Sequence, residues 1–110
     1  MKASKEFLSG TLSTIILALL KENAEMYGYE ICQLTKEKSE GYISLTEGAI
    51  YPALHKLEKK GLISASKRQV NGRTRKYYRI NKKSESLINQ QIQLLNIFSE
   101  HVQKILKPAL

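Results

Sequence analysis

Apolar residues recur at helical spacing along four stretches of this chain, the first of which spans residues 5–22. Ser4 precedes this stretch and is a residue type that commonly caps a helix N-terminus. A second helix is predicted to begin at Tyr27-Gly28 and to end at Gly41. The apolar positions of these two helices are Phe7, Leu8, Leu12, Ile15, Ile16, Leu17, Leu19, Leu20, Ile31, Cys32 and Leu34. The first helix is apolar around so much of its surface that it needs more than one neighbour.

A third helix is predicted to begin after Thr46, with Glu47 in the first turn, where the helix dipole favours a carboxylate. Its buried face would be formed by Ile50, Leu54 and Leu57. Gly61 would end it. Pro52 lies beyond the first turn and removes one backbone donor, so we expect a bend or a late helix start there.

A β-hairpin is predicted to follow, with its turn at Asn71-Gly72. This dipeptide is a strong hairpin signal because a type I′ turn needs positive φ at both central residues. Counting back from this turn pairs Val70 with Arg73 and brings Ile63 opposite Ile80. The same register pairs Ala65 with Tyr78 on the apolar face, and Ser64 with Arg79 and Ser66 with Tyr77 on the other. A longer loop would shift the register.

The last helix is predicted over residues 82–107, ending before Pro108. A helix of this length would be about 39 Å long, which exceeds the small body that precedes it. An apolar helix that extends beyond its own domain usually packs on another chain. We therefore expect a homodimer through this helix, helped by the N-terminal helix. The expected interface residues are Leu8, Leu12, Leu87, Leu94, Leu95, Phe98, Val102 and Ile105.

The fold predicted from these elements is α+β and mostly α, a winged helix-turn-helix at residues 1–81 followed by a long C-terminal dimerisation helix at 82–110. With 110 residues, 42% of them hydrophobic, the chain suffices for one domain with a small core. The longest apolar run, residues 15–20, is too short for a membrane span, and the N-terminus lacks a signal-peptide pattern, so a cytoplasmic location is expected. The single cysteine, Cys32, is interpreted as a buried small hydrophobe, with a redox sensor as the alternative.

Positive charge is concentrated in one part of the chain. Residues 55–83 carry eleven Lys and Arg and a single acid, Glu58, for a local balance of +10. The remaining residues carry seven Lys and Arg and nine acids, so the whole formal net charge of +8 arises from this segment. Phosphate groups are the natural partner for such a concentration of cations.

The third helix provides the first set of candidate DNA-binding residues. Its N-terminal half lies where recognition helices contact base edges, and the side opposite the buried face is polar. The candidates on this helix are Thr46, Glu47, Gly48, Tyr51, His55 and Lys56. Glu47 could accept a hydrogen bond from a cytosine amine or could serve the helix dipole alone. An ordinary solvated helix face is the alternative interpretation.

The hairpin provides the second set, which comprises Lys67, Arg68, Arg73, Arg75 and Lys76. In the predicted register Arg68 faces Arg75 and Lys67 faces Lys76, and like charges directly opposite are destabilising. Phosphate groups would relieve both repulsions. Arg73, beside the turn, is suited to reach a DNA backbone or minor groove. A sheet edge protected by lysines is the alternative.

Three motifs occur in order along the chain. Tyr27-Gly28-Tyr29-Glu30 opens the second helix. The third helix carries Gly48-Ala49-Ile50-Tyr51-Pro52-Ala53-Leu54, then Leu57-Glu58 and Gly61-Leu62-Ile63, and the hairpin returns through residues 72–78. In this order they resemble the PadR family of bacterial transcriptional regulators, over roughly residues 8–80.

The resemblance implies a homodimeric repressor that binds double-stranded DNA at an inverted-repeat operator, often autoregulatory, and in some members controls efflux or stress genes. The chain length is similar to the short subfamily, in which one C-terminal helix serves for dimerisation. Ala49 stands where threonine is usual in the family, and Ser84 where glycine is frequent. Some short members stack planar drugs on a tryptophan in the dimer cavity. This chain has no tryptophan, and Leu95 and Phe98 lie near that point, so drug stacking is not carried over from the family. The hypothesis for this chain is a small hydrophobic effector that enters the dimer interface near these two residues.

Other classes of function fit the sequence less well. The two histidines, His55 and His101, lie on different helices, and there is no phosphate-binding glycine loop and no metal-ligand spacing, so neither an enzyme nor a cofactor is expected. The remaining alternatives are a winged-helix protein–protein interaction module and a nonspecific nucleic-acid-binding protein. Band shifts at two salt concentrations and a test of sequence preference would separate them.

Overall fold

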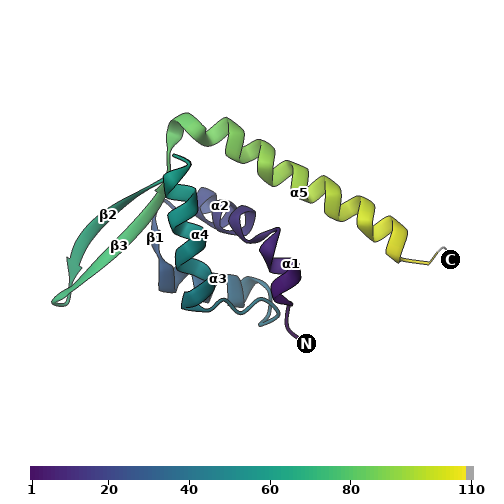
Figure 1. The fold of residues 1–110 in the computed structure, drawn as a ribbon, viewed down its shortest axis with the longest axis horizontal. Helices are drawn as coiled ribbons and strands as arrows, with labels where there is room; N and C mark the ends of the chain where they lie inside the picture. The colour runs from purple at the N-terminus through teal and green to yellow at the C-terminus, as the bar shows by residue number, and fades with distance from the viewer. Residues whose placement is uncertain (109–110) are drawn as a thin grey trace.

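A computed structural model describes residues 1–108 of the chain. The helices are α1 (Lys5–Ser9), α2 (Leu12–Glu22), α3 (Gly28–Lys38), α4 (Glu47–Lys59) and α5 (Glu85–Leu106), with a short 3-10 turn η1 (Lys82–Ser84). The strands are β1 (Met26–Tyr27), β2 (Ile63–Val70) and β3 (Arg73–Ile80). The first four helices form a small body, from which the hairpin of β2 and β3 projects on one side while α5 runs away on the other (Figure 1). The predicted winged helix-turn-helix with a long C-terminal helix is confirmed.

The single helix expected over residues 5–22 was a wrong prediction, because the structure has two helices there. Ser4 caps α1 as predicted, since its side chain accepts a hydrogen bond from the Phe7 backbone N–H at 3.3 Å. The helix ends at Ser9, and Gly10, a poor helix former, separates it from α2. The Thr11 hydroxyl donates to the Phe7 carbonyl at 2.9 Å, which stabilises the break.

The hydrophobic core lies where α2, α3, α4 and the base of the hairpin meet. Ile16, Leu17, Ile31 and Leu54 have no exposed side-chain surface, and Ile50, Leu57 and Ile63 have almost none. The predicted buried face of the third helix is therefore confirmed. Helix α3 ends at Lys38, slightly earlier than expected, and Gly41 (φ +83°) reverses the chain after it.

Helix α4 begins directly after Thr46 and includes Pro52 in its interior, so the late start considered for this helix is wrong. The proline removes one backbone donor from the helix, and its own side chain is exposed. Because Pro52 has no N–H group, the Gly48 carbonyl four residues earlier lacks its helical hydrogen bond. Gly48 is exposed, so this carbonyl can accept a hydrogen bond from water instead. Lys60 caps the helix, and Gly61 (φ +77°) follows.

The predicted hairpin register is confirmed from end to end. Val70 pairs with Arg73 across the Asn71-Gly72 turn, and both turn residues have positive φ. The sequence reasoning missed the third strand, because β1 is only two residues long. It adds Met26 and Tyr27 to the free edge of β3, opposite Tyr78 and Tyr77.

Asn81 joins the hairpin to the end of α4 and the start of α5. Its side-chain amide donates to the Gly61 carbonyl at 2.7 Å and its backbone N–H donates to the Leu62 carbonyl at 3.0 Å. Its side-chain oxygen accepts from the Ser64 hydroxyl. The Ser84 hydroxyl adds a second bond to Gly61 at 3.2 Å. Three elements are therefore held at one point.

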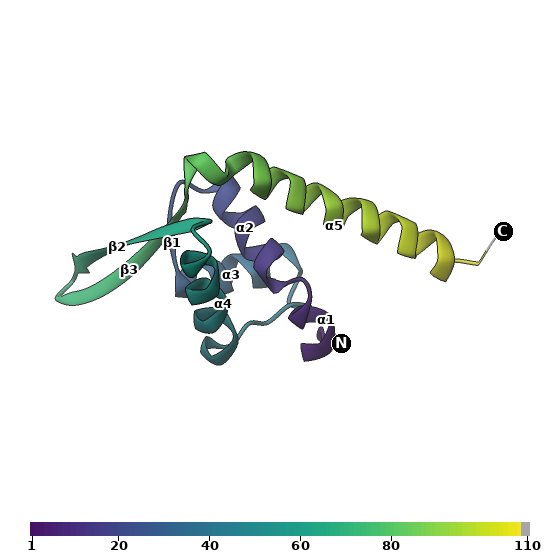
Figure 2. The same ribbon diagram turned by 45° about the horizontal axis from the view of Figure 1, so that its top comes forward.

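Helix α5 packs on α2 near its start and then continues beyond the body (Figure 2). Ile88 is fully buried there, and the Gln91 amide donates to the Thr14 hydroxyl at 2.9 Å. The radius of gyration is 15.2 Å, whereas a compact domain of this length would have about 13 Å. The predicted segment 82–110 begins with η1 instead of an α-helix, and its residues 109 and 110 lie outside the described part. No helix of the described chain is both long and apolar enough to cross a membrane.

Candidate nucleic-acid interface

Helix α4 presents its predicted DNA-binding side to solvent. All six candidate residues on this helix are exposed or half-buried, namely Thr46, Glu47, Gly48, Tyr51, His55 and Lys56. The opposite side is anchored in the core by Ile50, Leu54 and Leu57, whose exposed fractions are at most 2%. Glu47 lies in the first turn, and the Thr46 side chain makes no capping hydrogen bond, which leaves its hydroxyl available. The helix is thus held rigidly from behind and is open in front.

Five of the six candidates divide between two flanks of α4. Tyr51 lies on the flank of α4 that faces the hairpin. His55 lies on the same flank, beside Glu58 of α4 and Lys76 of β3. Thr46, Gly48 and Lys56 instead line a groove between α4 and the helices α1 and α2. The candidates of α4 are therefore exposed on two neighbouring flanks of the helix.

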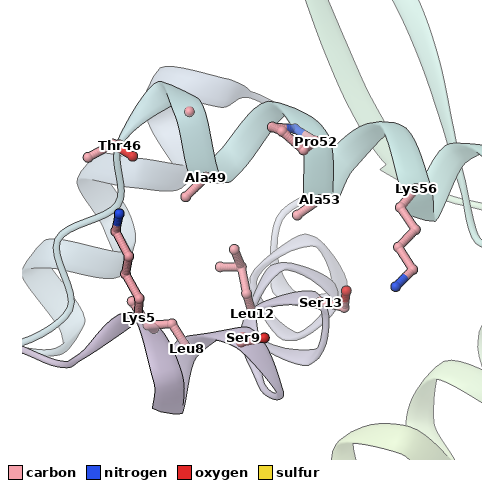
Figure 3. A pocket seen from close by; sticks show the side chains of 11 residues that line it. Lys5, Leu8, Ser9, Leu12, Ser13, Thr46, Ala49, Pro52, Ala53 and Lys56 are labelled. Carbon is pink, nitrogen blue, oxygen red and sulfur yellow. The ribbon is translucent and has the colours of Figure 1, made fainter.

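The groove beside α4 has a volume of about 560 Å³. Leu8 and Leu12 point into it from α1 and α2, while Ala49 and Ala53 face them from α4 (Figure 3). Two lysines, Lys5 and Lys56, lie toward its ends. Leu12 belongs at the same time to the protomer's core, with 9% of its surface exposed, which leaves little of it for a partner chain.

The Tyr27-Gly28-Tyr29-Glu30 motif places two aromatic rings next to the hairpin. The Glu30 carboxylate accepts a hydrogen bond from the Tyr27 backbone N–H at 3.1 Å, which caps the start of α3. The rings of Tyr27 and Tyr29 are stacked with centroids 6.3 Å apart, and Tyr27 meets Tyr77 edge-on at 5.4 Å. Sequence reasoning did not select these three tyrosines as site residues, because Tyr77 lies far along the chain from Tyr27 and Tyr29 and only the fold brings them together.

Gly28 lets α3 and α4 approach each other at the Tyr51 side chain. A Cβ atom at Gly28 would lie 2.9 Å from the Tyr51 hydroxyl oxygen and 3.0 Å from the ring, closer than ordinary contacts allow. Tyr51 is nevertheless 45% exposed. One side of its ring therefore packs on the α3 backbone while the other remains available for a ligand.

We expect Gly28→Ala to destabilise the protein by roughly 1–3 kcal/mol, because the added methyl group must displace the Tyr51 ring. Gly48→Ala is the control, since the nearest atom to its added Cβ is 3.8 Å away. That control should be neutral or stabilising by about 0.5 kcal/mol. Urea unfolding of both variants measures the difference. Equal midpoints for the two variants would contradict the close approach of Gly28 and Tyr51.

One face of the hairpin carries arginines stacked on tyrosines. The Arg68 guanidinium lies 3.7 Å from the centroid of Tyr77 and pairs with the Glu25 carboxylate. Arg75 lies 4.5 Å from the centroid of Tyr27. These contacts attract each guanidinium group to a ring face. They also reduce the repulsion between Arg68 and Arg75, which face each other as predicted.

The opposite face carries the Lys67–Lys76 pair. The Lys76 ammonium is 3.2 Å from the Glu58 carboxylate on α4. This hydrogen bond raises the pKa of Lys76 above its usual value. Glu25 and Glu58 each pair with one cation of a facing pair, so part of the repulsion is already reduced within the protein.

Between the hairpin and the helices α3 and α4 lies a cleft of about 530 Å³. It is lined by Tyr27, Tyr29, Tyr51, Arg73, Thr74, Arg75 and Lys76. The strand β1 pairs with β3 only at residues 77 and 78, so the edge of β3 beyond it faces this cleft. Arginine, lysine and tyrosine side chains are residue types that bind phosphate oxygens, so this cleft could hold a nucleic-acid backbone.

Six of the eight candidate dimer residues lie on α5. Leu87, Leu94, Phe98 and Ile105 are between 57% and 82% exposed. Leu95 and Val102 are half-buried, and Leu8 on α1 is half-buried as well. Ile97 and Leu106 are further exposed apolar residues that the prediction did not include.

Neither Cys32 nor the histidines form a chemical centre. Cys32 is half-buried, and burial, with a smaller effect of Glu47, raises the pKa of its thiol, which disfavours a reactive thiolate. His101 bonds to the Ile97 carbonyl of its own helix at 2.8 Å. Within residues 1–108, no three His, Cys, Asp or Glu side chains lie close enough together to hold a metal ion.

A core-anchored helix with an open polar side, next to a basic two-stranded hairpin, defines a winged helix-turn-helix DNA-binding protein. The family model that matches is the transcriptional regulator PadR-like family, over residues 16–90. The chain therefore belongs to the PadR-like family of transcriptional regulators, whose members bind DNA and are not enzymes.

Similar proteins agree with this assignment. The chain is 36% identical to the transcriptional regulator Rv3488 of Mycobacterium tuberculosis over 75 residues, 68% of this chain and 66% of that protein. A transcriptional regulator from Clostridium thermocellum superposes with a TM-score of 0.82 at 29% identity, covering 94% of this chain and all of that one. A PadR-like regulator from Bacillus cereus gives 0.77 at 28% identity, covering 96% and 100%.

Proposed function

We propose that this PadR-like regulator is a homodimeric repressor that binds an inverted-repeat operator through α4 and the hairpin. The observation that carries the proposal is the placement of an open helix face and a basic ribbon on either side of one tyrosine-lined cleft. Such a regulator would act in the cytoplasm, where bacterial DNA lies.

The N-terminal half of α4 supplies the base contacts in this proposal. Tyr51 and His55 are exposed on the side toward the hairpin, where a major groove would receive them. Thr46, Glu47 and Gly48 form the first turn and its cap, which enters a groove first. A dimer would present two such helices about 34 Å apart, which corresponds to one turn of the double helix.

Long helices provide the contact between subunits in the proposal. Leu87, Leu94, Phe98 and Ile105 are separated by seven, four and seven residues, so they form one stripe along α5. These residues are exposed, and α5 extends beyond the body of the protein. Both observations support packing against α5 of a second copy of this chain. N-terminal Leu8 lies in the neighbouring groove and could extend the interface.

The proposal includes a small hydrophobic effector. This molecule enters the dimer interface near Leu95 and Phe98 and changes the separation of the two α4 helices. It would release DNA only if it bound one dimer arrangement more tightly than the other. Titration of the free dimer with planar drugs and hydrophobic cations tests this step, and an absence of binding by all of them removes it.

The proposed function is tested by selecting DNA from a random library and measuring affinity for the selected and random sequences at several salt concentrations. We expect the selected sites to contain inverted repeats and to bind more tightly than random DNA by at least a factor of about 10³. Equal affinity for both would indicate a nonspecific nucleic-acid-binding protein. No affinity at low salt would indicate a protein–protein interaction module instead.

The double variant Arg73→Ala with Arg75→Ala should weaken binding to operator and random DNA alike. Neither arginine has an acidic partner within residues 1–108, so both are free to bind phosphate. The slope of log affinity against log salt should decrease by about 0.9 for each phosphate that the variant no longer neutralises. A variant that kept its affinity for random DNA but bound operator no better than random sequence would show that these arginines read bases instead.

A further inference from the structure

The four cations that face each other across the hairpin are not equivalent. Arg68 pairs with Glu25, and Lys76 pairs with Glu58 at 3.2 Å. Their facing partners, Arg75 and Lys67, have no acidic partner among residues 1–108. Each facing pair therefore contains one cation bound within the protein and one that is available to a ligand.

The two acids lie on different elements, and together they hold the hairpin from both of its faces. Glu25 lies in the loop between α2 and β1, directly before the strand that joins the edge of β3. Glu58 lies in the last turn of α4. Arg68 and Lys76 are on opposite faces of the ribbon because consecutive pairs alternate. The ribbon is thus braced against the α2–β1 loop on one face and against α4 on the other.

These ion pairs contribute little to folding stability. The side chains of Arg68 and Glu25 are 47% and 36% exposed, and those of Lys76 and Glu58 are 40% and 34% exposed. Ion pairs with this much solvent contact usually stabilise a protein only weakly. Their position has two other effects. They restrict the direction of the hairpin, and they reduce the number of cations that are free to bind a ligand.

We propose that Glu25 and Glu58 are positioning residues of the DNA-binding surface, each holding one cation of a facing pair so that the hairpin keeps a fixed angle to α4. This inference rests on the proposed function and adds a division of roles among its cations. Arg68 and Lys76 orient the hairpin, while Lys67 and Arg75 are left for phosphate. Specificity benefits because the hairpin meets the duplex at one angle only and because fewer cations bind phosphate indiscriminately.

Removing either acid has two expected effects of opposite sign. The freed cation becomes able to bind a further phosphate, which strengthens binding to any DNA sequence. One added phosphate interaction should steepen the salt slope by about 0.9 and raise affinity for random DNA about fivefold at 0.15 M salt. At the same time the hairpin no longer keeps its fixed angle, so operator affinity should not rise in parallel. The ratio of operator to random affinity should therefore fall.

The test compares Glu25→Gln, Glu58→Gln and the double variant with the control Glu22→Gln. Glu22 pairs with Lys38 at 2.8 Å, and neither residue belongs to the hairpin, so the control also removes one acid and breaks one exposed ion pair. Affinities for operator and random DNA are measured over a salt series. We expect the double variant to show a slope steeper by up to about 1.8 and the control to show a small uniform change. Equal slopes and equal operator-to-random ratios for the double variant and the control would overturn the proposal.

A measurement without DNA separates this inference from the proposed function. Backbone NMR relaxation of residues 67–76 should show lower order parameters in Glu25→Gln and Glu58→Gln than in the wild type or in Glu22→Gln. Unchanged order parameters and amide shifts in the hairpin would overturn the positioning role, even if DNA binds normally. If the wild type binds no DNA while the hairpin loosens as expected, the proposed function fails and the bracing role stands.

Discussion

The Phe98→Glu variant is expected to be a monomer at micromolar concentration and to bind operator at least about a hundredfold more weakly than the wild type. Phe98 is 67% exposed in the protomer and lies on the same stripe of α5 as Leu94 and Ile105. A carboxylate in the centre of an apolar helix–helix interface must be buried without a partner, which costs more than the interface can offset. A monomer can contact only one half-site, and the gain from binding two linked half-sites is commonly about 10²–10⁴-fold.

Asn96→Glu provides the matched control on the same helix. Asn96 is exposed and lies about half a turn from Phe98, on the other side of α5. It changes the net charge by the same amount but should leave the dimer intact. Light scattering after size exclusion and operator affinity are measured for both variants. A monomeric wild type under these conditions, or a dimeric Phe98→Glu variant with normal operator binding, would refute the role of α5.

The second large effect is expected for Leu54→Ala, which should destabilise the protein by about 2–5 kcal/mol. Leu54 is completely buried at the centre of α4, where the helix contacts the core. The folded state of a small domain is commonly stabilised by only about 5–15 kcal/mol, so a large part of the population would unfold on mild heating. At temperatures where this variant is unfolded, binding to operator and to random DNA should disappear together, because the whole helix is no longer anchored.

His55→Ala is the comparison that separates base reading from folding. His55 is exposed on the opposite side of the same helix, so its removal should leave the urea midpoint unchanged. Operator affinity should fall by about 1–3 kcal/mol, and affinity for random DNA should change little. A His55→Ala variant with full operator discrimination would remove this residue from the proposed reading surface.

The hairpin could be predicted in full from the sequence because its register depends on local information. Asn71-Gly72 determines the turn, and a two-residue turn leaves only one pairing in which Ile63 and Ile80 share a face. The core of α4 could be predicted for a similar reason, since Ile50, Leu54 and Leu57 repeat at helical spacing. Local pattern and tertiary structure agree at these places.

The features that could not be predicted depend on residues far apart in the chain. The strand β1 is too short to show an alternating pattern, and it exists because Met26 and Tyr27 reach the edge of β3. The ion pair between Glu25 and Arg68 joins residues 43 positions apart, so no spacing in the sequence indicates it. For this reason the facing cations looked unrelieved before the fold was known.

The break between α1 and α2 was missed for a different reason. The apolar stripe passes through the break without interruption, since Leu8 and Leu12 keep helical spacing on either side of it. Gly10 lowers helix propensity by about 1 kcal/mol, which a continuous stripe can outweigh. The Thr11 side chain shifts the balance by bonding to the Phe7 carbonyl, a local competition that a hydrophobic pattern does not reveal.

Strand β3 pairs with β2, which is close to it along the chain, and with β1, which is far from it. This difference in sequence separation favours an order in which the two pairings form. The β2–β3 ribbon needs only a two-residue turn, so it can close within microseconds through pairing of adjacent segments. Strand β1 can join only after the chain through α3 and α4 has looped back, which costs closure entropy that local pairing does not offset. We therefore expect the Tyr27–Tyr77 contact to form after the β2–β3 hairpin. Because the paired residues Met26 and Tyr78 also belong to the hydrophobic core, the surface that would meet DNA is completed only together with the core behind it.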